Sequence, residues 1–227
     1  ASASSGLPVT FSVVSGPALL NGGSLVLTAA GTVVVSAQQL GSASYQPTAV
    51  IERSFTVGKI AQSISFEVPE RKTFGDVPFK VTATASSGLD VALSVLSGPA
   101  VINDGMVTLN AGGVVLLRAM QTGSVNFDAA QTVDRTLVVD PAVQTLQFGE
   151  LENRVFGSGP FGLLASASSG LPVTFSVVSG SALLNGGSLV LTGAGTVVVS
   201  AQQLGSASYL PTTVVERSFV VNKASQS

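Results

Sequence analysis

Acidic and basic side chains stand next to each other at three matching places in the chain. These acid-arginine steps are Glu52-Arg53, Asp134-Arg135 and Glu216-Arg217. Neighbouring residues of a β-strand point to opposite faces, so the two side chains of one step cannot pair with each other. We expect each step to form cross-strand ion pairs worth under about 1 kcal/mol, or else a lateral contact with another chain.

Carboxylate pairs are the other candidates for chemistry. Glu67 and Glu70 form one close pair, and Glu150 and Glu152 form a second at positions that do not match the first. Acid-base catalysis needs one carboxyl of a pair to be desolvated in a cleft, which a strand surface seldom supplies. The sequence contains no His and no Cys, so the common nucleophile-base pairs and zinc ligands are missing. We therefore predict no catalytic, cofactor-binding or metal-binding residues, and a protein that is not an enzyme.

Tyr45 and Tyr209 share one position near the end of a loop, and Phe127 takes that position between them. Exposed aromatic rings are typical of carbohydrate sites. Because Phe replaces Tyr here, the sequence favours packing at the corner of a domain, and a weak glycan contact through Tyr45 and Tyr209 is the alternative.

Calcium often stiffens the junctions between stacked β-domains, through clustered carboxylate and amide oxygens. The segments that would join domains here are residues 57–64, 139–146 and 221–227, and only Asp140 among them is a good calcium ligand. We expect junctions that work without calcium. Their shortness, without a Gly/Ser tract, predicts restricted motion between domains.

These residues belong to an internal repeat. The phrase Ala-Ser-Ala-Ser-Ser-Gly-Leu at residues 1–7 returns at residues 83–89, with Thr at its second position, and unchanged at residues 165–171. Each step is 82 residues long. A repeat of this length indicates a row of similar domains.

Three copies follow from this period: copy 1 is residues 1–63, copy 2 is residues 64–145 and copy 3 is residues 146–227. Copy 1 lacks the counterpart of its neighbours' first strand, and as a complete protein it would have an unpaired edge and an open core. We therefore expect the chain to be a window on a longer polypeptide with more copies on either side. The 63 residues of copy 1 are identical to residues 165–227 at 54 positions, but to residues 83–145 at 26. The pattern suggests that a pair of domains was duplicated.

Each copy has the pattern of an all-β domain. Short segments rich in Val, Leu, Thr and Phe alternate with Gly, Pro, Asn and Ser, which is typical of a β-sandwich. Tight hairpins are predicted at Asn21-Gly22-Gly23, Asn103-Asp104-Gly105 and Asn185-Gly186-Gly187, because these residues tolerate positive φ. The expected core residues are Phe11, Phe55, Phe66, Leu93, Leu137, Phe148, Phe175 and Phe219. The fold class is thus tandem immunoglobulin-like β-sandwich domains.

A resemblance to a known family rests on a succession of short motifs. These are Gln62 to Phe66, Phe74-Gly75, Pro78-Phe79, Ala83 to Leu89, Ser97 to Pro99 and Ala111 to Val115. The succession resembles the bacterial immunoglobulin-like repeats of very large surface and adhesin-type proteins, over the whole chain. The resemblance implies an extracellular or cell-surface location, many copies in a row, a role as stalk or adhesive surface, no enzymatic activity and no fixed ligand. We also expect no cofactor.

The composition limits the partners. The net charge is -2 and charged residues make up 10% of the chain, without the clustered positive charge that nucleic acid binding requires. No apolar run approaches the roughly 18 residues that a membrane span needs. We expect a structural segment that packs against neighbouring repeats and other copies of the protein, in a stalk, fibre or sheath. The alternatives are an adhesin whose loops bind glycans or a host surface, and an accessory module beside an enzyme domain.

Overall fold

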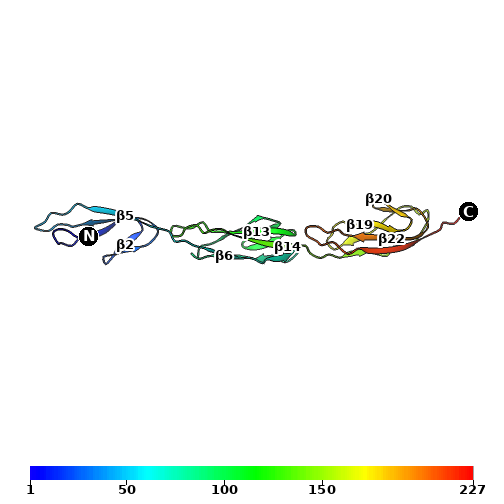
Figure 1. Cartoon of the computed structure of the whole chain (residues 1–227), viewed down its shortest axis with the longest axis horizontal. Helices are drawn as coiled ribbons and strands as arrows, with labels where there is room; N and C mark the ends of the chain where they lie inside the picture. Colours follow the sequence, from blue (N-terminus) through cyan, green and yellow to red (C-terminus); the bar gives the residue numbers. More distant parts are fainter. Residues whose placement is uncertain (227) are drawn as a thin grey trace. The chain divides into compact units, whose positions relative to one another are not determined.

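The computed structural model describes residues 1–226 as a chain of short β-strands, β1 to β23 (Figure 1). These residues form no helix, and so no helix long and apolar enough to cross a membrane. The predicted all-β fold class is confirmed.

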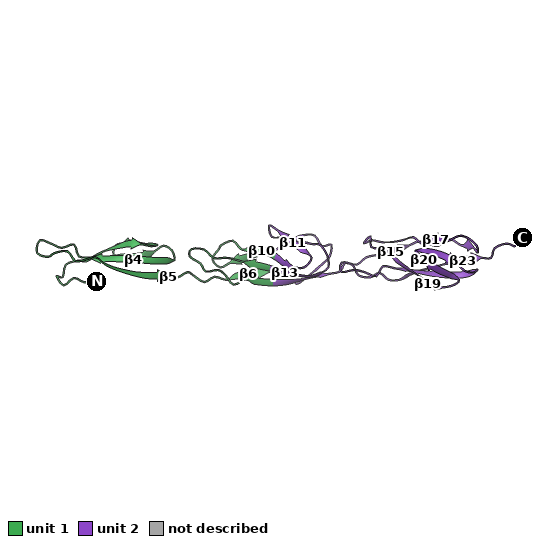
Figure 2. Ribbon diagram, turned by 90° about the horizontal axis from the view of Figure 1, so that it is seen from above, with its two compact units in different colours: residues 1–67, 82–94, 118–134 green, residues 68–81, 95–117, 135–227 purple. Residues whose placement is uncertain are grey.

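The chain divides into two compact units (Figure 2). Unit 1 consists of residues 1–67, 82–94 and 118–134, and unit 2 of residues 68–81, 95–117 and 135–227. Copy 1 falls within unit 1 and copy 3 within unit 2. The limits of the three domains stay a prediction.

Copy 3 has the complete set of strands. They are β15 (Leu146–Phe148), β16 (Arg154–Val155), β17 (Phe161–Gly162), β18 (Ala165–Ala167), β19 (Thr174–Ser179), β20 (Ala182–Asn185), β21 (Ser188–Leu191), β22 (Gly195–Gln202) and β23 (Val215–Asn222). One sheet has the order β16-β23-β22-β19, with β16 parallel to β23 and the other pairs antiparallel. Facing it are the pair β15-β18 and the sheet β17-β21-β20. With β17 and β18 as two parts of one strand, these are the ABED and CFG sheets of an immunoglobulin-type sandwich.

The core of copy 3 lies between these sheets. It is entirely apolar and consists of Phe148, Leu163, Ala182, Leu189, Val197, Val199, Ala201, Phe219 and Val221. Alternate residues of β22 and β23 point into it, as the period of a strand requires. Two aromatic contacts close the core: Phe161 meets Phe219 edge-on with ring centroids 5.9 Å apart, and Phe148 meets Phe175 at 5.6 Å.

The strands of copy 2 are distributed over both units. They are β6 (Ile64–Glu67), β7 (Arg71–Thr73), β8 (Phe79–Lys80), β9 (Thr82–Ala85), β10 (Ala92–Ser97), β11 (Ala100–Asn103), β12 (Met106–Leu109), β13 (Gly113–Met120) and β14 (Val133–Asp140). In unit 1, β6 pairs with β9. In unit 2, β7 runs parallel to the end of β14, and β12 pairs with both β8 and β11.

Copy 1 contains five strands. They are β1 (Thr10–Ser15), β2 (Ala18–Asn21), β3 (Ser24–Leu27), β4 (Gly31–Gln38) and β5 (Ile51–Val57). They form a sheet of order β1-β4-β5 and the hairpin β2-β3. No strand in residues 1–63 corresponds to β15, β16 or β17 of copy 3.

All three predicted hairpins are confirmed. Asn21 faces Ser24 across β2-β3, which leaves Gly22 and Gly23 as a two-residue turn with φ of 55° and 83°. The turns in the other two copies have the same form, and Asp104 there adopts a φ of 49°. Two successive positive φ values are what a type I′ turn requires.

The predicted core residues divide by copy. Phe66, Leu137, Phe148 and Phe219 are buried, and Leu93 and Phe175 are half-buried. Phe11 and Phe55 in copy 1 are 41% and 39% exposed. The two exposed rings lie in the copy whose residues 1–63 include no counterpart of β15.

Candidate functional site

A loop of copy 2 contacts the end of copy 1 within unit 1. Ile60 and Phe127 form an isolated parallel β-bridge. The amide of Ile60 donates to the carbonyl oxygen of Asn126 at 2.8 Å, and the amide of Asp128 donates to the carbonyl oxygen of Ile60 at 3.0 Å. The linker after β5 is therefore held by the loop of residues 123–128. We call this contact junction 1.

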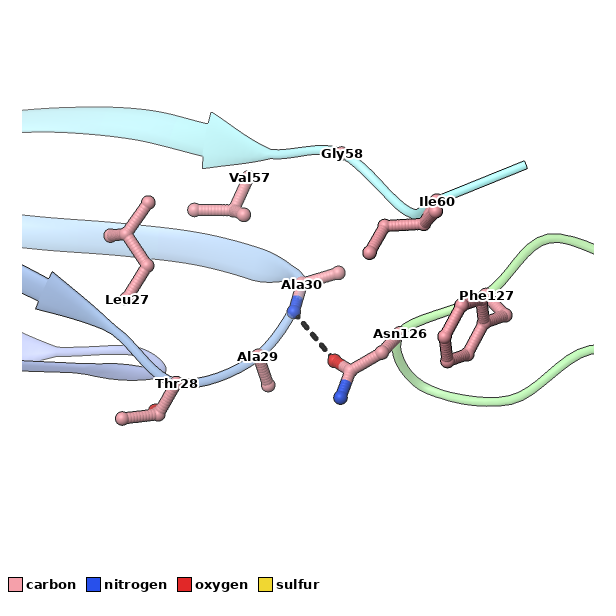
Figure 3. A pocket seen from close by; sticks show the side chains of 9 residues that line it. All are labelled: Leu27, Thr28, Ala29, Ala30, Val57, Gly58, Ile60, Asn126 and Phe127. Carbon is pink, nitrogen blue, oxygen red and sulfur yellow. Dashed lines mark hydrogen bonds between the residues drawn. The ribbon is translucent and has the colours of Figure 1, made fainter. Parts of the chain in front are cut away.

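A side-chain hydrogen bond extends junction 1 to the turn between β3 and β4. The amide of Ala30 donates to Oδ1 of Asn126 at 2.9 Å (Figure 3). A shallow pocket opens around this bond, and the figure shows Ile60, Val57 and Phe127 around it. The lining is mostly apolar and contains no acid-base pair.

Gln62 secures the linker from the other side. Its Nε2 donates to Oε1 of Gln121 and to the carbonyl oxygen of Asp128, both at 2.5 Å. Its own Oε1 accepts a hydrogen bond from the Ser87 hydroxyl. Gln121 is buried, so these bonds satisfy polar atoms that would be costly to leave without partners.

The same geometry occurs 82 residues later, within unit 2. Ala142 and Tyr209 form the parallel bridge. The amide of Ala142 donates to the carbonyl oxygen of Ser208 at 2.9 Å, and the amide of Leu210 donates to that of Ala142 at 2.8 Å. We call this contact junction 2.

The polar side chains of junction 2 also match those of junction 1. Gln144 Nε2 donates to Oε1 of Gln203 at 2.5 Å and to the carbonyl oxygen of Leu210 at 2.6 Å, while Ser169 donates to Gln144 Oε1 at 2.5 Å. The bond to the turn differs in type, since the amide of Gly112 donates to the hydroxyl of Ser208 at 3.2 Å.

Asp140, the one calcium ligand that the sequence offered at a junction, is bound by an arginine. Arg71 Nε donates to Asp140 Oδ2 at 3.0 Å, and Arg71 Nη2 donates to Oδ1. This bidentate contact raises the pKa of Arg71 above its usual value. Residues 1–226 contain no cluster of three or more His, Cys, Asp or Glu side chains that could hold a metal ion.

The acid-arginine steps lie on strands β5, β14 and β23, and the structure places them in different contacts. Asp134 pairs with Arg118 on β13 through two hydrogen bonds of 2.7 Å, which lower the pKa of Asp134. Arg217 Nε lies 3.2 Å from Glu150 Oε1.

Within two of the steps, the arginine reaches back to the main chain. Arg53 and Arg217 donate to the carbonyl oxygens of Glu52 and Glu216 at 2.9 and 3.0 Å. The six residues do not gather into one site, and their role in lateral contacts stays a prediction.

The aromatic loop position lies at the junctions. Phe127 and Tyr209 are half-buried members of the two bridges, and the ring of Tyr209 also meets Phe74 edge-on with centroids 5.4 Å apart. Tyr45 is 54% exposed. One sequence position therefore carries two junction rings and one accessible ring.

Gln62 and Gln144 are junction residues that were not predicted from the sequence. A signal was present, because a glutamine stands at this position in each linker segment and recurs at Gln226. A second glutamine recurs at residues 39, 121 and 203 and is buried in each case. Recurrence of an uncharged polar residue within apolar surroundings points to a hydrogen-bond role, but the partner becomes visible only in the structure.

Comparisons with known proteins give distant similarities. No protein-family model matches the sequence, and no curated protein matches it. Among solved structures, Drosophila N-cadherin EC1-4 is 14% identical with a TM-score of 0.32, and the match covers 96% of this chain and 66% of that one.

Two further solved structures are similar at this level. Sidekick-1 immunoglobulin domains 1-4 are 10% identical with a TM-score of 0.35, covering 96% of this chain and 68% of that one. Domains 4-9 of the surface layer protein SbsC are 14% identical with a TM-score of 0.28, covering 96% and 39%. The chain thus spans less than two thirds of the N-cadherin and SbsC chains, and these similarities do not place it in a family.

Proposed function

We propose that this chain is a structural segment of a bacterial extracellular or cell-surface protein, in which β-sandwich repeats act as spacers of a stalk, fibre or sheath. The observation that supports the proposal most is the repetition of one junction: the same parallel bridge and the same glutamine network join successive copies in unit 1 and in unit 2. A spacer needs such docking, because a flexible linker would let successive domains move independently.

Direct contacts between successive repeats of the chain support calcium-independent junctions. Asp140 is engaged by Arg71, and the junction bonds are formed by amides, hydroxyls and carbonyls. We also propose that this segment has no catalytic activity. Packing of several chains side by side is part of the same proposal, supported by the low content of charged residues, 10% of the chain.

Backbone ¹⁵N relaxation of the whole chain tests the spacer function. We expect the amides of all three copies to fit one anisotropic tumbling motion, unchanged by EDTA or by millimolar calcium. A control variant with three glycines inserted after Pro141 should separate copy 3 into an independently tumbling domain. Independent tumbling of the three copies in the unmodified chain would contradict the proposal.

Adhesion is the second candidate, and the exposure of Tyr45 favours it. The ring stands in a loop, where binding residues tend to lie, and could stack on a sugar. Binding of the chain to a glycan array, lost on Tyr45→Ala, would support this function. An array without any hit would contradict it.

A further inference from the structure

The two junctions differ at one pair of positions. The turn residue that donates its amide is Ala30 in junction 1 and Gly112 in junction 2, and the loop residue that accepts is Asn126 and Ser208, respectively. The surfaces that join no other copy in this chain carry Ala194 at the turn position and Ser44 at the loop position.

Glycine is required at residue 112 because the loop of copy 3 approaches it closely, and not because its backbone adopts a conformation that favours glycine. A Cβ atom at residue 112 would lie 1.9 Å from the carbonyl oxygen of Ala207, far inside van der Waals contact with main-chain atoms. The φ of Gly112 is not in the left-handed region, and alanine occupies the equivalent positions 30 and 194. An alanine at 112 is therefore compatible with the fold of copy 2 and incompatible with the loop that docks on it.

Junction 1 accommodates the methyl group of Ala30 with a longer acceptor. The Oδ1 atom of asparagine lies one bond further from the main chain than the Oγ atom of serine, and it reaches the Ala30 amide at 2.9 Å. The serine of junction 2 reaches the Gly112 amide at 3.2 Å with its loop carbonyl pressed against the turn. Each acceptor thus suits the turn it meets.

We propose that these residues form two size-matched pairs, Ala30 with Asn126 and Gly112 with Ser208, which determine the order of the repeats. A loop with serine at the acceptor position, which we call a serine-type loop, excludes a turn that carries an alanine methyl group. A loop with asparagine at that position, an asparagine-type loop, leaves a gap when it meets a glycine turn. Both kinds of mismatch weaken the docking. This inference rests on the proposed function, since it concerns how the spacers choose their neighbours.

The pairing rule names the partner of each remaining surface. The loop of residues 41–46 carries Ser44, so it fits a repeat that ends in a glycine turn, as copy 2 does at residues 111–113. The turn of residues 193–195 carries Ala194, so it fits a repeat with an asparagine-type loop, as copy 2 has at residues 123–128. Ser44 and Ala194 do not match, so copies of this chain do not join end to end through these two surfaces. The partner of both surfaces is a repeat of the copy 2 type.

Amide hydrogen exchange in the whole chain tests the pairing. Gly112→Ala should make the junction amides of Ala142 and Leu210 exchange at least about tenfold faster, with the amides of β11 and β12 unchanged. Adding Ser208→Asn to Gly112→Ala should restore the protection of Ala142 to within about threefold.

Junction 1 supplies the reciprocal cycle and the control. Asn126→Ser should accelerate exchange of the Ile60 and Asp128 amides, and Ala30→Gly in the same chain should recover most of their protection. Ala194→Gly, at the turn that joins no other copy here, should leave every junction amide unchanged.

Three outcomes would overturn the pairing: Gly112→Ala without effect on Ala142 and Leu210, an equal loss of protection in β11 and β12, or no rescue by Ser208→Asn. The unmodified chain separates this failure from that of the proposed function. If its copies tumble together with protected junction amides and the cycle shows no coupling, the spacer function stands and only the pairing is wrong. If the copies tumble independently and the junction amides are unprotected, the junctions are not docked, and both the spacer function and the pairing are wrong.

Discussion

Copy 1 and the equivalent part of copy 3 have nearly the same sequence but bury it differently. Residues 1–63 and 165–227 are identical at 54 of 63 positions. Phe219 is 2% exposed, while Phe55 at the same position is 39% exposed, and Leu189 is fully buried where Leu25 is half-buried. The strands and their registers agree residue by residue across β4-β5 and β22-β23.

The difference comes from residues outside the shared sequence. In copy 3, β15, β16 and β17 complete the two sheets, and Phe161 lies against the ring of Phe219. Copy 1 contains no such strands. The comparison teaches that strand pairing in this fold is encoded locally, whereas burial of the core depends on the segment that precedes the first shared strand.

Truncation of the phenylalanine shared by copies 1 and 3 should give the largest difference in stability loss between the two copies. Phe219→Ala should destabilise copy 3 by about 3 to 5 kcal/mol, because it removes a buried ring and leaves a cavity. Phe55→Ala should cost copy 1 about 1 kcal/mol or less, since much of that ring already contacts water. Hydrogen exchange resolved to β5 and β23 in the whole chain measures the two effects separately. Equal losses in the two strands would refute our interpretation of the burial.

Phe161→Ala should make the core of copy 3 more accessible to water, and so more like that of copy 1. The half-buried ring closes the core over Phe219 and also lies under the guanidinium of Arg154, 4.5 Å from the ring centroid. We expect a loss of about 1 to 3 kcal/mol, with exchange in β23 approaching that in β5. Phe161→Leu keeps most of the apolar volume and should recover more than half of the loss. Unchanged protection of β23 in Phe161→Ala would show that this contact does not seal the core.

The smallest expected effect is a difference in the pH dependence of stability between copy 2 and the outer copies. Arg118 pairs with Asp134, but serine replaces the arginine at residues 36 and 200. Since the pair lowers the folded-state pKa of Asp134, its contribution to stability is present above the unfolded value near 3.8 and is lost as the pH falls through the lowered value.

Asp134→Asn is the matched variant for this pair. It should reduce the acid sensitivity of copy 2 as the pH falls below about 3.8, without a change in the outer copies. Chemical-shift titration of Asp134 and exchange in β14 measure it. An unshifted titration of Asp134 would exclude a role for the pair.

The sequence was sufficient for the features that depend on local chemistry. The hairpin at Asn21-Gly22-Gly23 follows from the positive φ that its turn needs, and the strands follow from alternation and β-branched residues. These predictions need only neighbouring residues or a comparison of copies.

The junctions could not be predicted in the same way. Asn126 contacts Ala30 across 96 positions of sequence. Neither residue type indicates that the two would form a hydrogen bond. Tyr209 offered a packing role and a glycan role, and its contact with Phe74 becomes visible only when the chain folds. Gly112 looks like an ordinary turn glycine until the approach of Ala207 is known.

The parallel pairing of β16 with β23 has a mechanical consequence. β16 lies near the beginning of copy 3 and β23 at its end, and they run in the same direction with Arg154 opposite Val221 and Val155 opposite Asn222. Tension applied to the two ends of the copy pulls these strands past each other along their length. Their hydrogen bonds, including the one from the Phe156 amide to the Asn222 carbonyl oxygen at 2.8 Å, would then bear the load together, so copy 3 should resist stretching along its length.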